Sequence, residues 1–284
     1  MIEKYSDLVA EHLLENGALP DNGESKITKG KYDLLVEEYE IKTKETSQKL
    51  RKPIGIYTLL TLKHIFSNDD DAEKHYLKQF VSILKNYLKL DKYSVILVVG
   101  LGNRHISSDS LGTEVVKKII ITRNFANGTP QVCAFAPSVM GLTGIESADI
   151  IDGIIGKIKP NYVVMIDSLC ASDVSRLGVS FQVSNTPITP GSGIGNTRKK
   201  ISSQISTISI GVPLVVYSNT YIKSALNKSG IYINDVSDKK LKAKLNSLLK
   251  SDSNELVTPS EIEHIVDKIS KFIAKALNIV FMGE

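Results

Sequence analysis

The sequence has no tryptophan and only two cysteines, Cys133 and Cys170, in 284 residues. Both cysteines lie in apolar stretches, so we expect reduced, buried thiols and no disulfide framework. No apolar run approaches the roughly 18 residues that mark a membrane-spanning helix. The first residues also lack the basic and apolar regions of a signal peptide. These absences predict a cytoplasmic protein that does not bind a membrane.

An excess of either charge is lacking as well. Lys and Arg number 35 against 31 Asp and Glu, which leaves a net charge of +4. This value is too small to indicate direct nucleic-acid binding. Hydrophobic residues make up 42% and charged residues 23% of the chain, which excludes a disordered, collagen-like or coiled-coil protein.

Residues 1–90 are expected to form an amino-terminal α+β portion packed on the rest. Within it, residues 32–41 and 54–62 favour strands, because β-branched and aromatic residues concentrate there. Three aspartates at 69–71 precede a helical pattern. A cation site is one interpretation, but we favour a helix start, where negative charge complements the helix dipole.

Residues 91–284 are expected to form an α/β core with a carboxy-terminal helix, either separate from residues 1–90 or continuous with them. Apolar runs at 95–99 and 162–166 favour strands buried on both faces, and residues 145–158 have helical apolar spacing. Strands that alternate with helices predict a mostly parallel central sheet flanked by helices. Thr258-Pro259-Ser260-Glu261 resembles a capping box at the start of the last helix.

The glycine-rich stretches fit no standard phosphate-binding motif. Gly100-Leu101-Gly102-Asn103 follows a predicted strand, but His105 stands where the dinucleotide fingerprint needs glycine. Residues 190–196 lack the Lys-Ser/Thr ending of a Walker loop. The histidines form no HExxH pair. We therefore expect neither a cofactor nor a metal.

Asp109 and Asp167 are the candidate catalytic residues. Asp167 directly follows the strand predicted to end at Ile166, and ligands of α/β sheets bind beyond the carboxyl ends of strands. Asp109 lies beside a helix start that Ser107 or Ser108 would cap. If the two strands are neighbours, the carboxylates meet in one crevice, share a proton and suit amide hydrolysis. A helix-start residue and a turn former explain the same pattern, and spacing alone favours that explanation.

Several stretches resemble the germination protease family of spore-forming bacteria, in the order in which the family has them. They are Gly100-Leu101-Gly102-Asn103, Asp109-Ser110-Leu111-Gly112, residues 136–146 (APSVMGLTGIE), Ile166-Asp167-Ser168-Leu169, residues 190–198 (PGSGIGNTR) and Ile210-Gly211-Val212-Pro213. Weaker matches are Asp7-Leu8 and Lys52-Pro53-Ile54-Gly55.

The resemblance implies a fold related to hydrogenase maturation proteases, and an endopeptidase that degrades small acid-soluble spore proteins in the spore core during germination. Family members are regarded as atypical aspartic peptidases that are made as zymogens and assemble as homotetramers. The two proposed catalytic aspartates of the family match Asp109 and Asp167. Asp7-Leu8 matches a stretch close to the family's processing point, so little or no prosegment is expected. Either this protein departs from the zymogen pattern and needs no removal of an inhibitory segment, or it is regulated otherwise.

Substrate-binding residues are expected in two glycine-containing segments. Backbone N–H groups near Gly102 and Asn103 are candidate donors to a scissile carbonyl or to substrate backbone. A second group of candidates lies in the glycine-rich loop, and its members are Ser192, Gly193, Asn196 and Arg198. Arg198 is a candidate contact for an acidic substrate side chain or for the aspartates. Tight turns that need glycine explain the glycines equally well.

The chain departs from the family beside both aspartates, where Ser110 and Ser168 replace alanine, and Asn185 replaces an aspartate. These departures motivate a second hypothesis, a catalytically inactive paralogue that binds a protein or peptide in the same crevice. A third hypothesis is a metal-dependent maturation-type peptidase that uses His105 together with the two aspartates.

Overall fold

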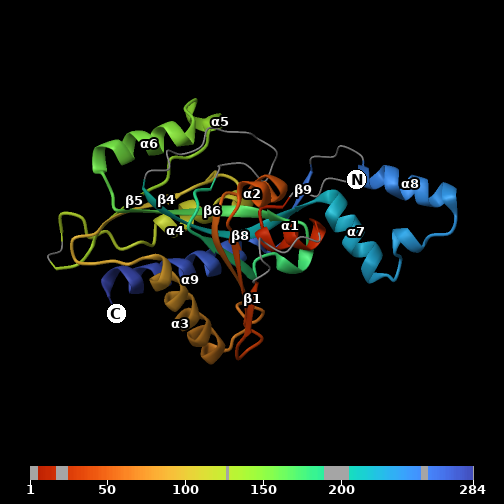
Figure 1. The fold of residues 1–284 in the computed structure, drawn as a ribbon, viewed down its shortest axis with the longest axis horizontal. Helices are drawn as coiled ribbons and strands as arrows, with labels where there is room; N and C mark the ends of the chain where they lie inside the picture. The colour runs from red at the N-terminus through yellow and green to blue at the C-terminus, as the bar shows by residue number, and fades with distance from the viewer. Residues whose placement is uncertain (1–5, 17–24, 126–127, 189–204, 251–254, 284) are drawn as a thin grey trace.

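The structure is a computed structural model that describes residues 6–16, 25–125, 128–188, 205–250 and 255–283. Within these residues, nine strands form one sheet in the order β1-β2-β3-β7-β8-β6-β4-β5, and β9 pairs with β8 (Figure 1). Neighbours among β5, β4, β6 and β8 are parallel, and the remaining pairs are antiparallel. The predicted α/β class with a parallel core is therefore confirmed.

The strands of the parallel core are β4 (Val95–Gly100), β5 (Gln131–Phe135), β6 (Tyr162–Ala171) and β8 (Ser206–Tyr217). The other strands are β1 (Lys26–Lys29), β2 (Leu35–Ile41), β3 (Gly55–Thr61), β7 (Ser180–Ser184) and β9 (Leu256–Val257). The strands expected at 32–41 and 54–62 are thus present as β2 and β3, and β3 joins the sheet by pairing with β7.

The longer helices are α1 (Val9–Asn16), α3 (Asp70–Tyr87), α6 (Ser147–Ile158), α7 (Ser218–Lys228), α8 (Lys239–Lys250) and α9 (Ile262–Met282). The shorter ones are α2 (Lys44–Leu50), the 3-10 turn η1 (Ser107–Asp109), α4 (Leu111–Val116), α5 (Met140–Thr143) and the 3-10 turn η2 (Val174–Arg176). None of the helices in the described part of the chain is long and apolar enough to cross a membrane.

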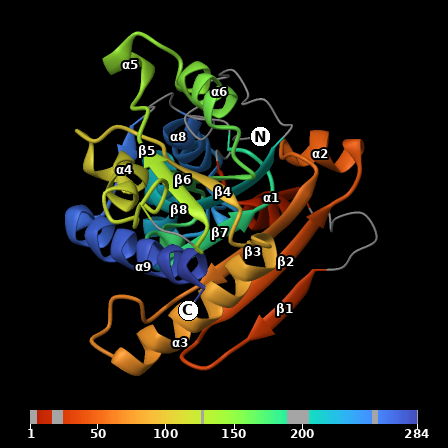
Figure 2. The same ribbon diagram turned by 90° about the vertical axis from the view of Figure 1, so that its left-hand side faces the viewer.

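Helices cover both faces of the sheet. Figure 1 shows α6 above the sheet and α3 and α9 below it, and Figure 2 gives the same layers from the side. On the α9 face, the rings of Phe80, Phe181 and Phe272 lie 5.6–5.8 Å apart and join α3, β7 and α9. On the opposite face, α6 packs on β4 and β6, whereas α1 packs on β2, β3 and the end of β6.

Strand β6 is longer than the sequence predicts. The expectation that this strand ends at Ile166 is wrong, because β6 continues to Ala171 and carries Asp167 inside the strand. The reason is β8, which pairs with β6 from Tyr162 to Ala171 and runs without a break through Gly211 and Pro213. Hydrogen bonds to one long neighbour keep β6 extended past the point where β4 stops.

The two helix starts that the sequence singles out behave differently. Asp69 is the N-cap of α3, and its carboxylate accepts hydrogen bonds from the N–H groups of Asp71 and Ala72, both at 3.0 Å. The helix-start interpretation is therefore confirmed. The capping box at residues 258–261 is wrong, because α9 begins at Ile262 without a side-chain cap. The hydroxyl of Thr258 donates instead to the carbonyl of Leu214 in β8 at 2.8 Å.

Two glycines allow α4 to approach the end of β4. A Cβ atom on Gly112 would lie 2.4 Å from the carbonyl oxygen of Ile166 and 2.5 Å from the backbone of Leu101. A Cβ atom on Gly100 would lie 2.1 Å from the carbonyl oxygen of Gly112. Real Cβ atoms do not come this close to backbone, so the contact requires glycine on both sides.

Replacing Gly112 with alanine should therefore destabilise the fold strongly, by about 3 kcal/mol or more, because rigid backbone surrounds the new methyl group. The matched control is Gly153→Ala in α6, where nothing lies within 4 Å of the added Cβ. That variant should gain about 0.5–1 kcal/mol, since alanine favours a helix over glycine. Urea unfolding of both variants measures the difference. Equal stabilities of the two variants would contradict the close contact.

Candidate active site

Asp167 lies where the parallel strand β4 ends beside β6. Gly100, the last residue of β4, is in register with Ile166, and the N–H of Leu101 donates to the carbonyl of Ile166 at 2.8 Å. Asp167 is the next residue of β6, and only 8% of its surface is exposed. Strand alternation puts its side chain on the α6 face, between Met165 and Leu169. The carboxyl group is therefore buried at the carboxyl end of the parallel core.

Asp109 lies at the end of η1, directly before α4. Its carboxylate Oδ2 accepts a hydrogen bond from the N–H of Asn103 at 2.9 Å, and an N–H donor stabilises the ionised form of its acceptor. Gly102 has a φ angle of +103°, and a Cβ atom there would lie 1.9 Å from the carbonyl oxygen of Asp109. The glycine turn after β4 thus wraps around Asp109 and fixes its position.

The two aspartates interact electrostatically. Burial raises the pKa of Asp167 well above its usual value, and the nearby charges of Asp109 and Asp7 raise it further, while the N–H of Ser168 opposes the shift. That N–H donates to Asp167 Oδ1 at 2.9 Å. A buried carboxyl beside other carboxylates keeps its proton at a pH where an exposed one is ionised.

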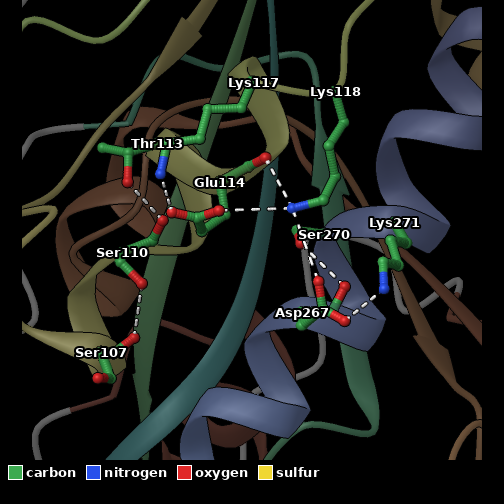
Figure 3. Close-up of polar contacts among 9 residues, drawn as sticks. All are labelled: Ser107, Ser110, Thr113, Glu114, Lys117, Lys118, Asp267, Ser270 and Lys271. Atoms are coloured by element: carbon green, nitrogen blue, oxygen red, sulfur yellow. Dashed lines mark hydrogen bonds and ion pairs between the residues drawn. The ribbon is translucent and has the colours of Figure 1, made fainter.

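A polar network holds α4, and with it Asp109, against α9. Figure 3 shows Lys118, two residues after α4, between Glu114, at 3.4 Å, and Asp267 of α9, at 3.9 Å. The hydroxyl of Ser110 donates to the carbonyl of Ser107 at 2.9 Å, which closes η1 onto the start of α4. The serine cap predicted at 107 or 108 is therefore wrong, because η1 intervenes and α4 starts only at Leu111. Asp109 is held from both ends of this short segment.

The amino-terminal segment contributes groups to this site that the sequence analysis did not assign. Asp7 exchanges two hydrogen bonds with Cys170 of β6: its N–H donates to the carbonyl of Cys170, and its Oδ2 accepts from the N–H of Cys170, both at 2.9 Å. The carbonyl oxygen of Asp7 accepts from Lys52 Nζ at 2.9 Å and from Gln182 Nε2 at 3.2 Å. Asp7-Leu8 and Lys52 gave only weak family matches in the sequence.

Glu11 anchors the same segment through buried charge. Its Oε2 accepts a hydrogen bond from the N–H of Ser172 at 2.7 Å and another from the hydroxyl of Ser6. Its Oε1 lies 3.4 Å from Nε of Arg176 in η2. Burial raises the pKa of Glu11, although these partners oppose the shift. The start of α1 is therefore tied to the end of β6.

Buried hydroxyl groups lie on the same face of the sheet, at the position of Met165, two residues before Asp167. Ser184 Oγ is 2.9 Å from Ser209 Oγ and 3.0 Å from Thr186 Oγ1, which donates to Tyr57 at 3.3 Å. These contacts join β3, β7 and β8. Beside them, Asn185 Oδ1 accepts from the N–H of Ile56 at 2.8 Å. Asn185 thus provides a neutral hydrogen-bond acceptor at the position where the resemblance to the family leads us to expect an aspartate.

The structure describes only two of the six predicted substrate-binding residues. Gly102 and Asn103 lie beside Asp109. The N–H of Asn103 donates to the Asp109 carboxylate in this structure and not to a substrate, so the substrate-binding role of both residues stays a prediction. Four candidates lie outside the described residues: Ser192, Gly193, Asn196 and Arg198.

The metal-dependent hypothesis needs three protein ligands in one place. His105 is exposed, and its N–H donates to Asn103 Oδ1 at 3.0 Å. In the part of the chain that the structure describes, no three His, Cys, Asp or Glu side chains form a group that would hold a metal. The donor set therefore gives this hypothesis no support.

Comparison with known proteins identifies relatives over most of the chain. The family model described as germination protease matches residues 21–228. The germination protease of Clostridium acetobutylicum is 33% identical, over 93% of this chain and 89% of its own length. That of Caldanaerobacter subterraneus is 31% identical, over 96% and 91%. That of Bacillus subtilis is 40% identical over a shorter stretch, 61% of this chain and 51% of its own.

Among solved structures, a hydrogenase maturation protease from Thermococcus kodakarensis overlaps 69% of this chain and 98% of its own, with 16% identity and a TM-score of 0.38. The sequence relatives carry the assignment, since they extend over nearly all of the chain at more than 30% identity. The family model covers the segments that hold both aspartates. The chain belongs to the germination protease family.

Proposed function

We propose that this protein is an aspartic-type endopeptidase that degrades small acid-soluble spore proteins during spore germination. Membership of a protease family supports hydrolysis of peptide bonds. The observation that carries the aspartic mechanism is the burial of Asp167 next to the charge of Asp109, which raises its pKa. Two carboxyl groups that cannot both ionise supply one acid and one base in a single site.

In this mechanism Asp109 is the base and Asp167 the acid. Asp109 accepts an N–H and is more exposed, which favours a carboxylate. Water attacks the carbonyl carbon of the scissile peptide and gives a proton to Asp109, while the π electron pair moves to the carbonyl oxygen. When the carbonyl re-forms, the C–N bond breaks and the leaving nitrogen takes the proton of Asp167. Proton exchange through solvent then restores the pair.

Three further features of the proposal rest on the resemblance to the family: synthesis as a zymogen, assembly as a homotetramer, and action in the spore core. The position of Asp7 supports a regulatory role for the amino-terminal segment, because this residue is bonded to β6 close to Asp167. The size of the particle in solution, measured by light scattering, tests the assembly.

Single replacement of Asp109 or Asp167 by asparagine should lower kcat on a small acid-soluble spore protein by about 10²–10⁴-fold, since each removes one proton-transfer group. The control is Asp70→Asn in the first turn of α3, an exposed carboxylate at the start of the helix. It should leave kcat unchanged. A folded Asp109 or Asp167 variant that cleaves as fast as the parent would refute the mechanism.

The pH dependence of stability gives a second test of Asp167. Because its pKa is raised in the folded state, the unfolded chain ionises first as the pH rises, and the fold loses stability until the pH passes the raised pKa. Asp167→Asn should therefore be more stable than the parent near neutral pH, by about 1–3 kcal/mol, and not near pH 3. Melting temperatures over this range measure the difference. A pH-independent difference would contradict a raised pKa.

A further inference from the structure

Two side-chain donors converge on one backbone carbonyl next to the aspartates. Lys52, just after α2, and Gln182, in β7, both donate to the carbonyl oxygen of Asp7, at 2.9 Å and 3.2 Å. Gln182 also accepts the N–H of Val9 at 2.8 Å. The peptide bond between Asp7 and Leu8 is therefore held from two sides. Of the two groups that donate to its carbonyl oxygen, one is an ammonium group.

The sheet register places these donors beside the catalytic aspartate. Gln182 is in register with Gly211, and Gly211 is in register with Asp167. Residues in register on neighbouring strands point to the same face, and the residue between these two is a glycine that the side chain of Leu169 covers. Asp7 itself is bonded to Cys170, three residues after Asp167 in β6. The carbonyl of Asp7 is thus bound by a residue on the face of the sheet that carries the Asp167 carboxyl group.

We propose that Lys52 and Gln182 are catalytic residues that polarise the carbonyl oxygen of the scissile peptide. In this structure the carbonyl of Asp7 occupies the position to which both side chains donate. The carbonyl of a protein substrate takes the same position during hydrolysis. The electron pair that moves onto this oxygen during attack by water is then stabilised by one charged and one neutral N–H donor. The products and the protons are those of the mechanism above, on which this inference rests.

A purely structural role does not explain the lysine well. The segment around Asp7 is already held by Cys170, by Ser172 through Glu11, and by Gln182 through Val9. Burial lowers the pKa of Lys52, while the carboxylates of Asp7 and Glu11 oppose the shift. Placing an ammonium group in partly buried surroundings to bind a neutral carbonyl is costly, but it is effective where negative charge develops on that oxygen.

The test measures kcat and KM of the purified protein on a small acid-soluble spore protein, with the mass of each variant recorded so that only chains with the same amino terminus are compared. Lys52→Met should lower kcat by about 10²–10³-fold with little change in KM, as expected for the loss of an oxyanion donor. Gln182→Met should lower kcat by about 10-fold, the effect of one neutral hydrogen bond. Lys52→Arg should restore most of the loss.

The matched control is Ser6→Ala, which removes a hydroxyl that accepts the N–H of Leu8 at 3.0 Å and holds the same segment without contacting the carbonyl. It should change kcat less than about twofold. Equal losses in Ser6→Ala and Lys52→Met would show that Lys52 is an anchor and would overturn the inference. A kcat equal to that of the parent in Lys52→Met would overturn this inference and leave the proposed function standing. If the lysine variant does not fold, the same result in Gln182→Met would do so. A folded parent that leaves the spore protein intact would overturn the proposed function as well.

Discussion

The contact between the backbones of Gly100 and Gly112 determines where every later part of the site lies. It brings the start of α4 against the end of β4, at the point where β4 stops and β6 continues with β8 as its neighbour. Asp109 precedes α4 by one residue, so its position follows from the same contact. The ion pair between Lys118, just after α4, and Asp267 of α9 holds the helix there from the other side. A side chain at either glycine would move Asp109 away from Asp167.

Burial of Asp167 is the second constraint, and it depends on how the helices divide the sheet. On its face, α6 covers β4 and the first half of β6, and α1 covers the end of β6 and the antiparallel strands. Asp167 lies between these two apolar clusters, in the part of β6 that β8 alone keeps extended. The polar groups of the site therefore lie at the boundary between the two apolar clusters.

The sequence allowed the class of fold to be predicted, because apolar runs and glycine turns are local signals, whereas the catalytic roles of Asp109 and Asp167 stay a prediction. It did not reveal that β6 continues through Asp167, since aspartate disfavours strands and only pairing with β8 outweighs that preference. The roles of Asp7 and Lys52 were missed for a different reason. Asp7 and Cys170 are 163 residues apart, and no local pattern reports a contact of that kind. Thr258 likewise fits a capping pattern, yet its hydroxyl finds a partner in β8.

The groups that meet at this site come from distant parts of the chain, with Asp7 near one end and Gln182 far beyond the middle. Contacts of such long range form late in folding. A chain still emerging from the ribosome has made Asp109 before β7 and β8 exist, and so carries its reactive groups apart. The complete site therefore forms only when the whole sheet has formed.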